Sequence, residues 1–463
     1  MDEKEETFEE LRSFVPESIP RHQRAILGKN VMESIWADMS RTRTPTWMSR
    51  APKNWGTTQR GKLSADNWRV ICTVHLPITL IRLWGEKTGR MKDILAHFMD
   101  LVSAVHVANM RVTSPNHIQT YNAHIKRYTR KLKALYPDEN LKPTHHAALH
   151  IGDMLHLFGP NHSHSGAHYE RYINFFHRMN TNEKIGEHRI GHSFSCSVSH
   201  DGLITGQLEA TLLKTSARSA NLRALLSDNE DVRDLVQDLI TTMDKINRED
   251  IRGFRLASIL DPSLPTFEPR SKLDPQVIEN TLHRLLCDLL DHSMDGAVMP
   301  KDANFMKEIS YRGVVYALST SSGFRDSSII FRERENPQHT KAGIIENIFQ
   351  YSYTREDGQS AEDIFMAVEE LTPITSFVDP YLQFGEFAGF LCEKKEGGNL
   401  RVIPMRQVAC HFAYTEMTDD WEGLIHVLPV DRVSDPGHKF LLNVPDRNYL
   451  VDDRIFHLQW IRR

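Results

Sequence analysis

The sequence has few cysteines and lacks the motifs of several large enzyme classes. Its 463 residues include only five cysteines, which are far apart and form no CxxC pair. This argues against a zinc ribbon and a disulfide framework and favours a reducing compartment. Neither GxxxxGK[ST] nor a GxGxxG after a strand is present, and no GxSxG occurs. The sequence therefore gives no support for a phosphate-binding loop or a nucleophile elbow.

Long apolar runs are also missing. The longest one, residues 70–84, is interrupted by His75, Pro77 and Arg82. It is too short to span a bilayer, so it is interpreted as a buried helix. The N-terminus is acidic, unlike a secretory signal. We expect a soluble intracellular protein with no membrane partner.

The composition is that of an ordinary globular protein. Hydrophobic residues make up 40% and charged residues 25% of the chain, and the formal net charge is −5. A chain of this length predicts two or three domains with substantial cores. Because the whole chain is no polycation, any binding to nucleic acid must come from a local basic patch.

The pattern along the chain predicts an α+β protein in two parts. Helical periodicity predicts helices at 27–39, 64–84 (kinked at Pro77), 91–110, 116–136, 145–158, 169–179, within 203–250 and at 275–291. Short β-rich runs follow at 313–319, 327–331, 343–353, 362–371, 385–393, 400–405, 408–417 and 424–430. We therefore predict an α-helical domain over 1–250, a Pro-containing connector over 251–304, a small antiparallel β-barrel or sandwich-like domain over 305–435, and a tail over 436–463.

The segment from Arg41 to Ala65 combines positive charge with aromatic rings. It contains six basic residues and no acid, and tryptophans are interleaved with them. Phosphates attract such cations and bases stack on such rings. The candidate nucleic-acid-binding residues are Arg50, Lys53, Arg60, Lys62, Trp47 and Trp55. The alternative is a solvated loop that its tryptophans pin to the core, and the sequence leaves both interpretations open.

Histidines are concentrated between residues 145 and 200. His146, His150 and Asp153 share one face of a predicted helix, a spacing that could serve a metal ion. The pattern is not HExxH and no cysteine supports it, and histidine-rich helices more often supply polar and packing contacts. We therefore assign no metal site and no cofactor.

Carboxylates for two-metal phosphoryl transfer would have to converge on one spot. The best isolated candidates are Asp66, Asp153 and Glu170. Asp66 fits better as a residue near a helix cap, and Glu170 as a partner of a basic group such as Arg171. We expect the three acids to be scattered over helices and assign no catalytic residue.

A proline, a histidine-rich helix, a Gly-Pro pair and a Glu-Arg pair follow one another between residues 143 and 171. They are Pro143, His145, His146, His150, Gly159, Pro160, Glu170 and Arg171. With residues 43–85 and the pieces GVVYALS, DSSIIF, DPYLQFGEFAG, QVACHFAYTEM and IHVLPVDR, this progression resembles the C-terminal part of fungal transposases of the CACTA (En/Spm-like) superfamily. The resemblance covers about residues 27–190 and 305–432.

The resemblance implies a transposase-derived protein. Members of that family carry an upstream RNase H-like core with the metal-binding acids, and we expect this chain to begin near the end of that core. No catalytic residue is carried over. The leading hypothesis is a nuclear, non-catalytic protein that binds DNA or chromatin, with the β-rich part as a protein-interaction module by analogy. The alternatives are a metal-dependent nuclease or strand-transfer enzyme with an unrecognised carboxylate site, and a decayed element product without selected function.

Overall fold

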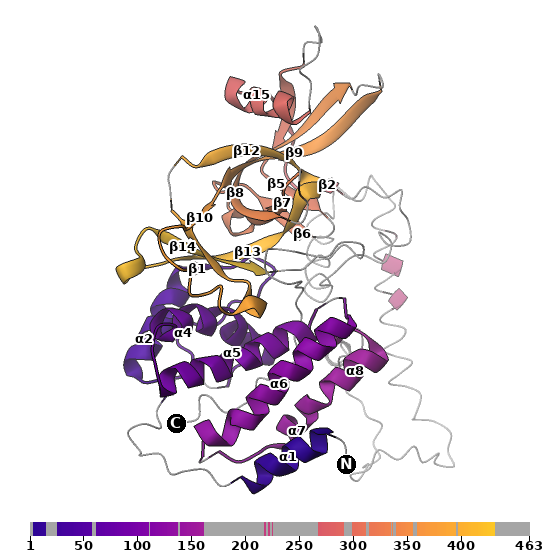
Figure 1. The fold of residues 1–463 in the computed structure, drawn as a ribbon. Helices are drawn as coiled ribbons and strands as arrows, with labels where there is room; N and C mark the ends of the chain where they lie inside the picture. Colours follow the sequence, from indigo (N-terminus) through magenta and orange to yellow (C-terminus); the bar gives the residue numbers. More distant parts are fainter. Residues whose placement is uncertain are drawn as a thin grey trace, which may run out of the picture. The chain divides into compact units, whose positions relative to one another are not determined.

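The chain has an α+β fold in which helices come first and antiparallel strands follow (Figure 1). The computed structural model describes residues 3–14, 26–57, 62–110, 112–137, 139–161, 267–290, 299–311, 314–334, 336, 339–354, 359–394 and 397–430, together with 217, 218, 221, 222 and 225. Met1–His164 and Phe254–Arg463 form one compact unit, and Ser165–Gly253 form a second. The first unit contains the elements that follow.

The helices predicted between residues 27 and 158 are present with small shifts of their ends, and a helix over residues 3–13 that was not predicted precedes them. They are α1 (Glu3–Ser13), α2 (Lys29–Arg41), α3 (Ala65–Val70), the π-helical turn η2 (Ile71–His75), α4 (Leu76–Trp84), α5 (Arg90–Ala108), α6 (Pro115–Leu135), α7 (Pro143–Leu149) and α8 (Ile151–Phe158). The helices predicted at 169–179 and within 203–250 lie outside the described residues, apart from isolated positions between 217 and 225. No helix in the described ranges is long and apolar enough to cross a membrane.

The apolar run at 70–84 is a buried helix, as predicted. Ser64 caps its start, accepting a hydrogen bond from the amide of Asn67 at 3.2 Å. The helix then widens into the π-helical turn η2 just before Pro77, which lacks the amide that would continue the α-helical ladder. Most side chains from Val70 to Trp84 are buried.

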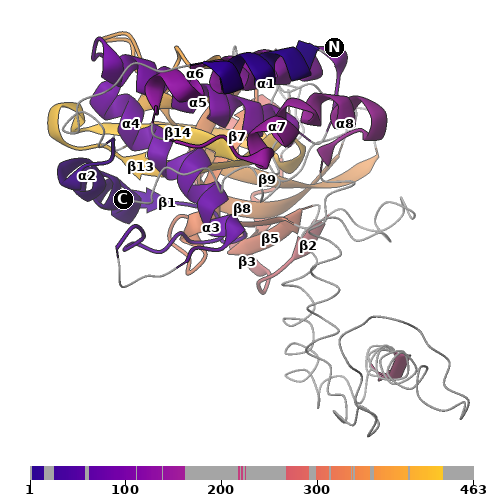
Figure 2. The same cartoon turned by 90° about the horizontal axis from the view of Figure 1, so that it is seen from below.

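Helices α5 and α6 pack against each other, and Figure 2 shows them side by side with α1 along α6. The side chain of Ser114 caps α6 and Pro115 occupies its first turn. The helix predicted over 145–158 is interrupted at His150, which ends α7 and precedes α8. This interruption changes the direction of the chain within the histidine-rich segment.

Most of the predicted β-runs form strands. The strands are β1 (Thr42–Arg43), β2 (Phe267–Pro269), β3 (Asp274–Val277), β4 (Asp302–Met306), β5 (Glu308–Tyr311), β6 (Val314–Ala317), β7 (Ser328–Arg332), β8 (Thr340–Thr354), β9 (Ser360–Glu370), β10 (Thr372–Pro373), β11 (Phe390–Glu393), β12 (Asn399–Pro404), β13 (Val408–Glu416) and β14 (Leu424–Val430). The helix predicted over 275–291 is shorter than expected, because β3 occupies its beginning and α15 (Asn280–Leu289) the rest.

The strands form one large sheet and one small sheet, both antiparallel. The large sheet has 11 strands with the main order β10-β11-β14-β13-β7-β8-β4-β3, while β1 pairs with β13 and β12 pairs with β9 beside β8. The small sheet has the order β2-β5-β6. The ends of the main path, β10 and β3, do not pair with each other, so the described strands contain no closed barrel.

The large sheet and the helices share one hydrophobic core. Along β13, Ala413 packs into the helical core while its neighbours Phe412 and Tyr414 belong to a cluster with other strands. This alternation is the two-residue period of a strand buried on both faces. Leu391 and Leu428 join Ala413 on the helical side. The predicted domain boundaries at 250, 304 and 435 stay predictions, but the sheet already takes in strands from 42–43 and 274–306.

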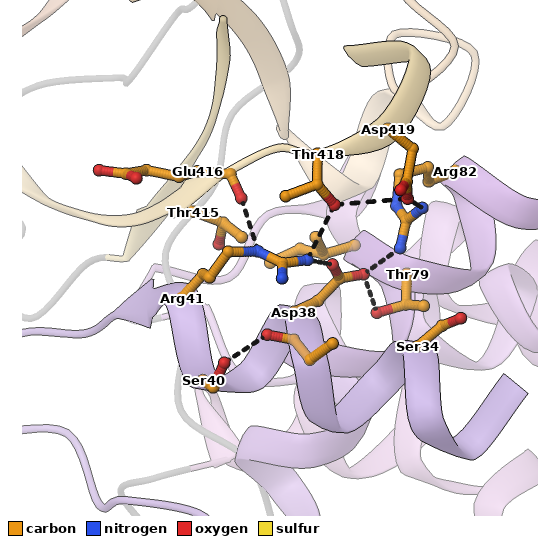
Figure 3. Close-up of polar contacts among 12 residues, drawn as sticks. Ser34, Asp38, Ser40, Arg41, Thr79, Arg82, Thr415, Glu416, Thr418 and Asp419 are labelled. Atoms are coloured by element: carbon orange, nitrogen blue, oxygen red, sulfur yellow. Dashed lines mark hydrogen bonds and ion pairs between the residues drawn. The ribbon is translucent and has the colours of Figure 1, made fainter. Parts of the chain in front are cut away.

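A buried carboxylate ties the helices to the end of β13 (Figure 3). The side chain of Asp38 in α2 is only 3% exposed and accepts from Arg41 at 2.5 Å and from Arg82 in α4 at 2.8 Å. The hydroxyl of Thr79 donates to the same carboxylate at 2.7 Å. Burying a charge is costly unless it is paired and hydrogen-bonded, and Asp38 is both.

The two arginines extend this cluster to the sheet. Arg41 donates to the carbonyl oxygen of Glu416 at 3.2 Å and to the hydroxyl of Thr418 at 3.1 Å, and Arg82 lies 3.2 Å from a carboxylate oxygen of Asp419. The chain after Arg41 then enters β1, whose Thr42 pairs with Thr415 of β13. We call Asp38, Arg41, Thr79, Arg82 and Thr418 the Asp38 cluster.

Burial also holds several histidines neutral. Burial lowers the pKa of His75, His97 and His145 to about 4 and that of His426 to about 3. The pKa of His124 is instead raised above its ordinary value. Burial lowers it, but hydrogen bonds to Asp100 and Glu386 raise it by more. The four histidines with a lowered pKa should therefore determine how the free energy of unfolding changes in mild acid.

Replacing Asp38 by alanine should destabilise the protein by about 3–5 kcal/mol, because the partly exposed Arg41 and Arg82 would both lose the buried carboxylate that pairs with them. The free energy of unfolding from urea denaturation measures this loss. Glu33→Ala is the matched control on the same helix, since Glu33 is exposed and its distance from Lys29 is 3.9 Å. We expect that control to change stability by less than about 1 kcal/mol. Equal losses in the two variants would contradict the role of Asp38.

Lowering the pH from 7 to 5 should also destabilise the fold. A histidine in the unfolded chain has a pKa of about 6.5, so the unfolded state binds more protons than the folded state between about pH 6.5 and 4. The stabilisation is complete above this window and is lost as the pH falls, by up to about 1.4 kcal/mol per pH unit for each buried histidine. Urea midpoints at several pH values test this, and His426→Phe should flatten the dependence. A urea midpoint that stays constant from pH 7 to 5 would contradict the role of the buried neutral histidines.

Candidate functional site

The first half of the basic segment is built into the sheet. Arg43 lies with its guanidinium 5.0 Å from the ring centre of Tyr414 and 3.3 Å from the carboxylate of Glu416. Thr46 donates from its amide and its hydroxyl to the buried carboxylate of Asp326, at 2.7 and 2.6 Å. Two strongly bonded anchors therefore fix the chain on either side of Pro45.

Trp47 contacts the sheet through a buried histidine. Its indole Nε1 donates to Nδ1 of His411 at 3.4 Å, and Nε2 of His411 lies 3.2 Å from the carbonyl oxygen of Asp326. Because an indole can only donate, His411 carries its proton on Nε2 and is neutral. Its ring stacks on Tyr316 with centroids 4.5 Å apart. Trp47 is partly buried by this packing, and stacking of a base on its ring stays a prediction.

Trp55 belongs to the core. It is 0% exposed, its indole lies 3.0 Å from the sulfur of Met39, and its carbonyl oxygen accepts from Trp36 at 3.2 Å. The hypothesis that Trp55 offers a stacking surface is therefore wrong for this structure, because a base could reach the ring only if the core opened. Its aromatic area holds the segment in place, as the pinned-loop interpretation proposed.

The cations of the second half remain at the surface. Arg50, Lys53 and Lys62 are exposed, whereas Arg60 lies outside the described residues. The backbone here is also fixed, since Asn67 donates to the carbonyl oxygen of Arg50 at 3.2 Å. Arg325 lies near Arg50, and its pKa is lowered first by burial and then by the charge of Arg50. We call Arg50, Lys53 and Lys62 the loop cations.

The basic face of α6 is engaged more closely by the protein itself. Arg127 lies 2.9 Å from the carboxylate of Asp100, and Lys133 donates to the carbonyl oxygens of Arg12 and Phe14 at 3.2 and 3.4 Å. Arg130 and Lys131 are exposed. The contacts of Arg127 and Lys133 hold helices together.

The structure brings the predicted histidines together and adds an acid from far away in the sequence. Nε2 of His146 lies 3.3 Å from Nε2 of His150, and the carboxylate of Glu5 in α1 lies 3.0 Å from His146. Asp153 lies on the other side of His150, 3.5 Å from Nδ1. All four side chains are neither buried nor fully exposed. Glu5 could not be found from spacing, because 141 residues separate it from His146.

The predicted scatter of Asp66, Asp153 and Glu170 stays a prediction. Asp153 lies on α8, where it pairs with Lys4 and lies near His150. Its pKa is lowered, first by the hydrogen bond from Lys4. The side chain of Asp66 and all of Glu170 lie outside the described residues. Within the described part of the chain, Asp153 therefore contacts the histidine cluster through His150.

Replacing Trp55 by alanine should lower the free energy of unfolding by about 3–5 kcal/mol, because it removes a fully buried indole. Thermal and urea denaturation measure this loss. Lys53→Ala is the control in the same segment and should change stability by less than about 0.5 kcal/mol, since Lys53 is exposed. If Trp55→Ala proved as stable as Lys53→Ala, the indole could not be the anchor of the segment.

Comparisons of the chain with protein-family models, curated proteins and solved structures found no match. The resemblance to CACTA transposases therefore depends on the sequence pieces that carry it and stays a hypothesis. Two local arrangements remain as candidates for function: the exposed loop cations, with the backbone held at Arg50, and the cluster of two histidines and a glutamate.

Proposed function

We propose that the protein is transposase-derived and binds double-stranded DNA in the nucleus through the phosphate backbone, without catalysing a reaction on it. The observation that carries this proposal is the exposure of Arg50, Lys53 and Lys62 in a segment that has no acid from Arg41 to Ala65. Phosphates bind such cations, and the released counterions favour the complex.

The anchoring of the segment supports the proposal. Thr46 is held by Asp326, Trp55 is buried, and Asn67 holds the backbone at Arg50. Cations on a backbone that is already ordered lose less conformational entropy on binding than cations on a free loop. The same anchoring removes Trp55 as a stacking surface. The expected mode of binding is thus contact with phosphates and little recognition of sequence.

Electrostatics limits the binding to this region. The net charge of −5 gives the chain as a whole no attraction for a polyanion. Arg325 lies close enough to Arg50 for the charge of Arg50 to lower its pKa, so the two cations reinforce the local positive potential. A phosphate between them would relieve their mutual repulsion.

We also propose that the two sheets form a sandwich-like module that contacts chromatin or another protein. In support, residues of the small sheet, such as Ile309 and Tyr316, share a hydrophobic cluster with Phe331 and Ile345 of the large sheet. This role is an analogy with other small β modules.

Replacing all three loop cations by alanine should weaken the binding of a short DNA duplex. Each lost phosphate contact lowers the slope of log K against log salt by about 1, so the triple variant should lose about 3. Fluorescence anisotropy over a range of salt concentrations measures both affinity and slope. The control is a triple alanine variant of Lys29, Lys87 and Lys92. These lysines are exposed and lie outside the basic segment, so the control variant removes the same amount of positive charge. Equal binding by the wild type and the loop-cation variant would refute the proposal.

The same preparations distinguish the alternatives. A metal-dependent nuclease would nick supercoiled DNA in Mg²⁺ or Mn²⁺. A decayed product without selected function would show no binding that depends on salt. We expect binding that depends on salt and no nicking with either metal.

A further inference from the structure

We propose that Glu5, His146 and His150 bind one divalent transition-metal ion, best matched by Zn²⁺, and that the ion fastens α1 to α7 and α8. This inference is independent of DNA binding, because none of the loop cations takes part in it. The three residues are called the zinc triad below.

The distances within the zinc triad fit a metal ion. The Glu5 oxygen and the two Nε2 atoms lie 3.0, 3.3 and 4.0 Å apart. A circle through these three atoms has a radius of about 2.0 Å, so an ion displaced from their plane toward a fourth ligand would lie about 2.2 Å from each atom, at the upper end of the usual Zn–N and Zn–O range. The three donor atoms therefore already lie at the spacing that one ion requires.

A second observation concerns the orientation of His150. The carboxylate of Asp153 lies 3.5 Å from its Nδ1. Lys4 pairs with the carboxylate of Asp153. An anion beside Nδ1 favours the tautomer with the proton there, which leaves the lone pair of Nε2 aimed at the triad. Metal-binding histidines commonly have such a carboxylate partner.

The ring of His146 is also held in place. Phe8 of α1 packs against it with ring centroids 4.7 Å apart. Without a metal, one proton on Nε2 of His146 can serve both Glu5 and His150 as acceptors. A metal ion would replace that shared proton and bond all three atoms at once.

The ligand types select the metal. Two imidazoles and one carboxylate suit Zn²⁺ and its neighbours Co²⁺ and Ni²⁺ better than Mg²⁺ or Ca²⁺, which prefer oxygen ligands. Three protein ligands leave a fourth position of a tetrahedral ion for water. The side chains of the triad are 32–44% exposed, so water can reach that position. Because Glu5 is on α1 and the histidines are on α7 and at the α7–α8 junction, the ion would link helices distant in sequence.

Titration of the untagged full-length protein with Co²⁺ tests the proposal. We expect one tightly bound equivalent with the visible absorption of a four- or five-coordinate Co²⁺ site, displaced by Zn²⁺. His150→Ala and Glu5→Ala should lose this signal, and Zn²⁺ should raise the thermal midpoint of the wild type but of neither variant. Asp153→Asn should keep the spectrum and weaken binding by about 10- to 100-fold, since it orients a ligand without touching the ion.

Matched controls lie on the same helices. Glu6 on α1 and His156 on α8 are exposed and belong to no such cluster within the described residues. Glu6→Ala and His156→Ala should bind Co²⁺ like the wild type. Circular dichroism of the metal-free variants checks that they fold. The proposal is overturned if the wild type shows no tight equivalent, or if His150→Ala folds and retains it.

Discussion

The fold depends on the buried carboxylate of Asp38. It is nearly inaccessible to water, and two arginines and the hydroxyl of Thr79 compensate its charge. Both arginines reach onward to the chain at the end of β13, so one carboxylate couples α2, α4 and the sheet. A buried charge tolerates little displacement of its partners, because each lost hydrogen bond leaves an uncompensated group in a region of low dielectric constant. The relative position of helices and sheet is specified there.

The basic segment begins at this cluster, so its first residues are held in place by it. It leaves α2 at Arg41, adds the short strand β1 to the sheet, and is held again by Asp326 and by the buried Trp55. Residues that looked like one binding surface in the sequence are thus divided. The aromatic rings pack inward, and the loop cations remain outside. This division changes the expected binding mode from base stacking to contact with phosphates.

The zinc triad was also only partly predictable from the sequence. The helical spacing of His146 and His150 was visible in the sequence, and the structure confirms that they lie together even though the helix is interrupted between them. Asp153 lies beside the other ring nitrogen of His150, Nδ1. Glu5, which lies beside these histidines, comes from the acidic N-terminal helix α1. Only the packing of α1 on α6 and the histidine segment brings it there.

The sequence by itself determined that helices come first and antiparallel strands follow, together with the buried run at 70–84, the cap at Ser64 and most strands after residue 313. These depend on periodicity and capping, which are local properties of the chain. It did not reveal β1 or the interruption at His150, because a two-residue strand and a single broken turn carry almost no local signal. Only the tertiary structure decided that Trp55 is core, that Arg50 lies near Arg325, and that Glu5 faces two histidines. The reason is physical: each of these facts is a contact between residues far apart in sequence, and such contacts are set by the packing of whole elements.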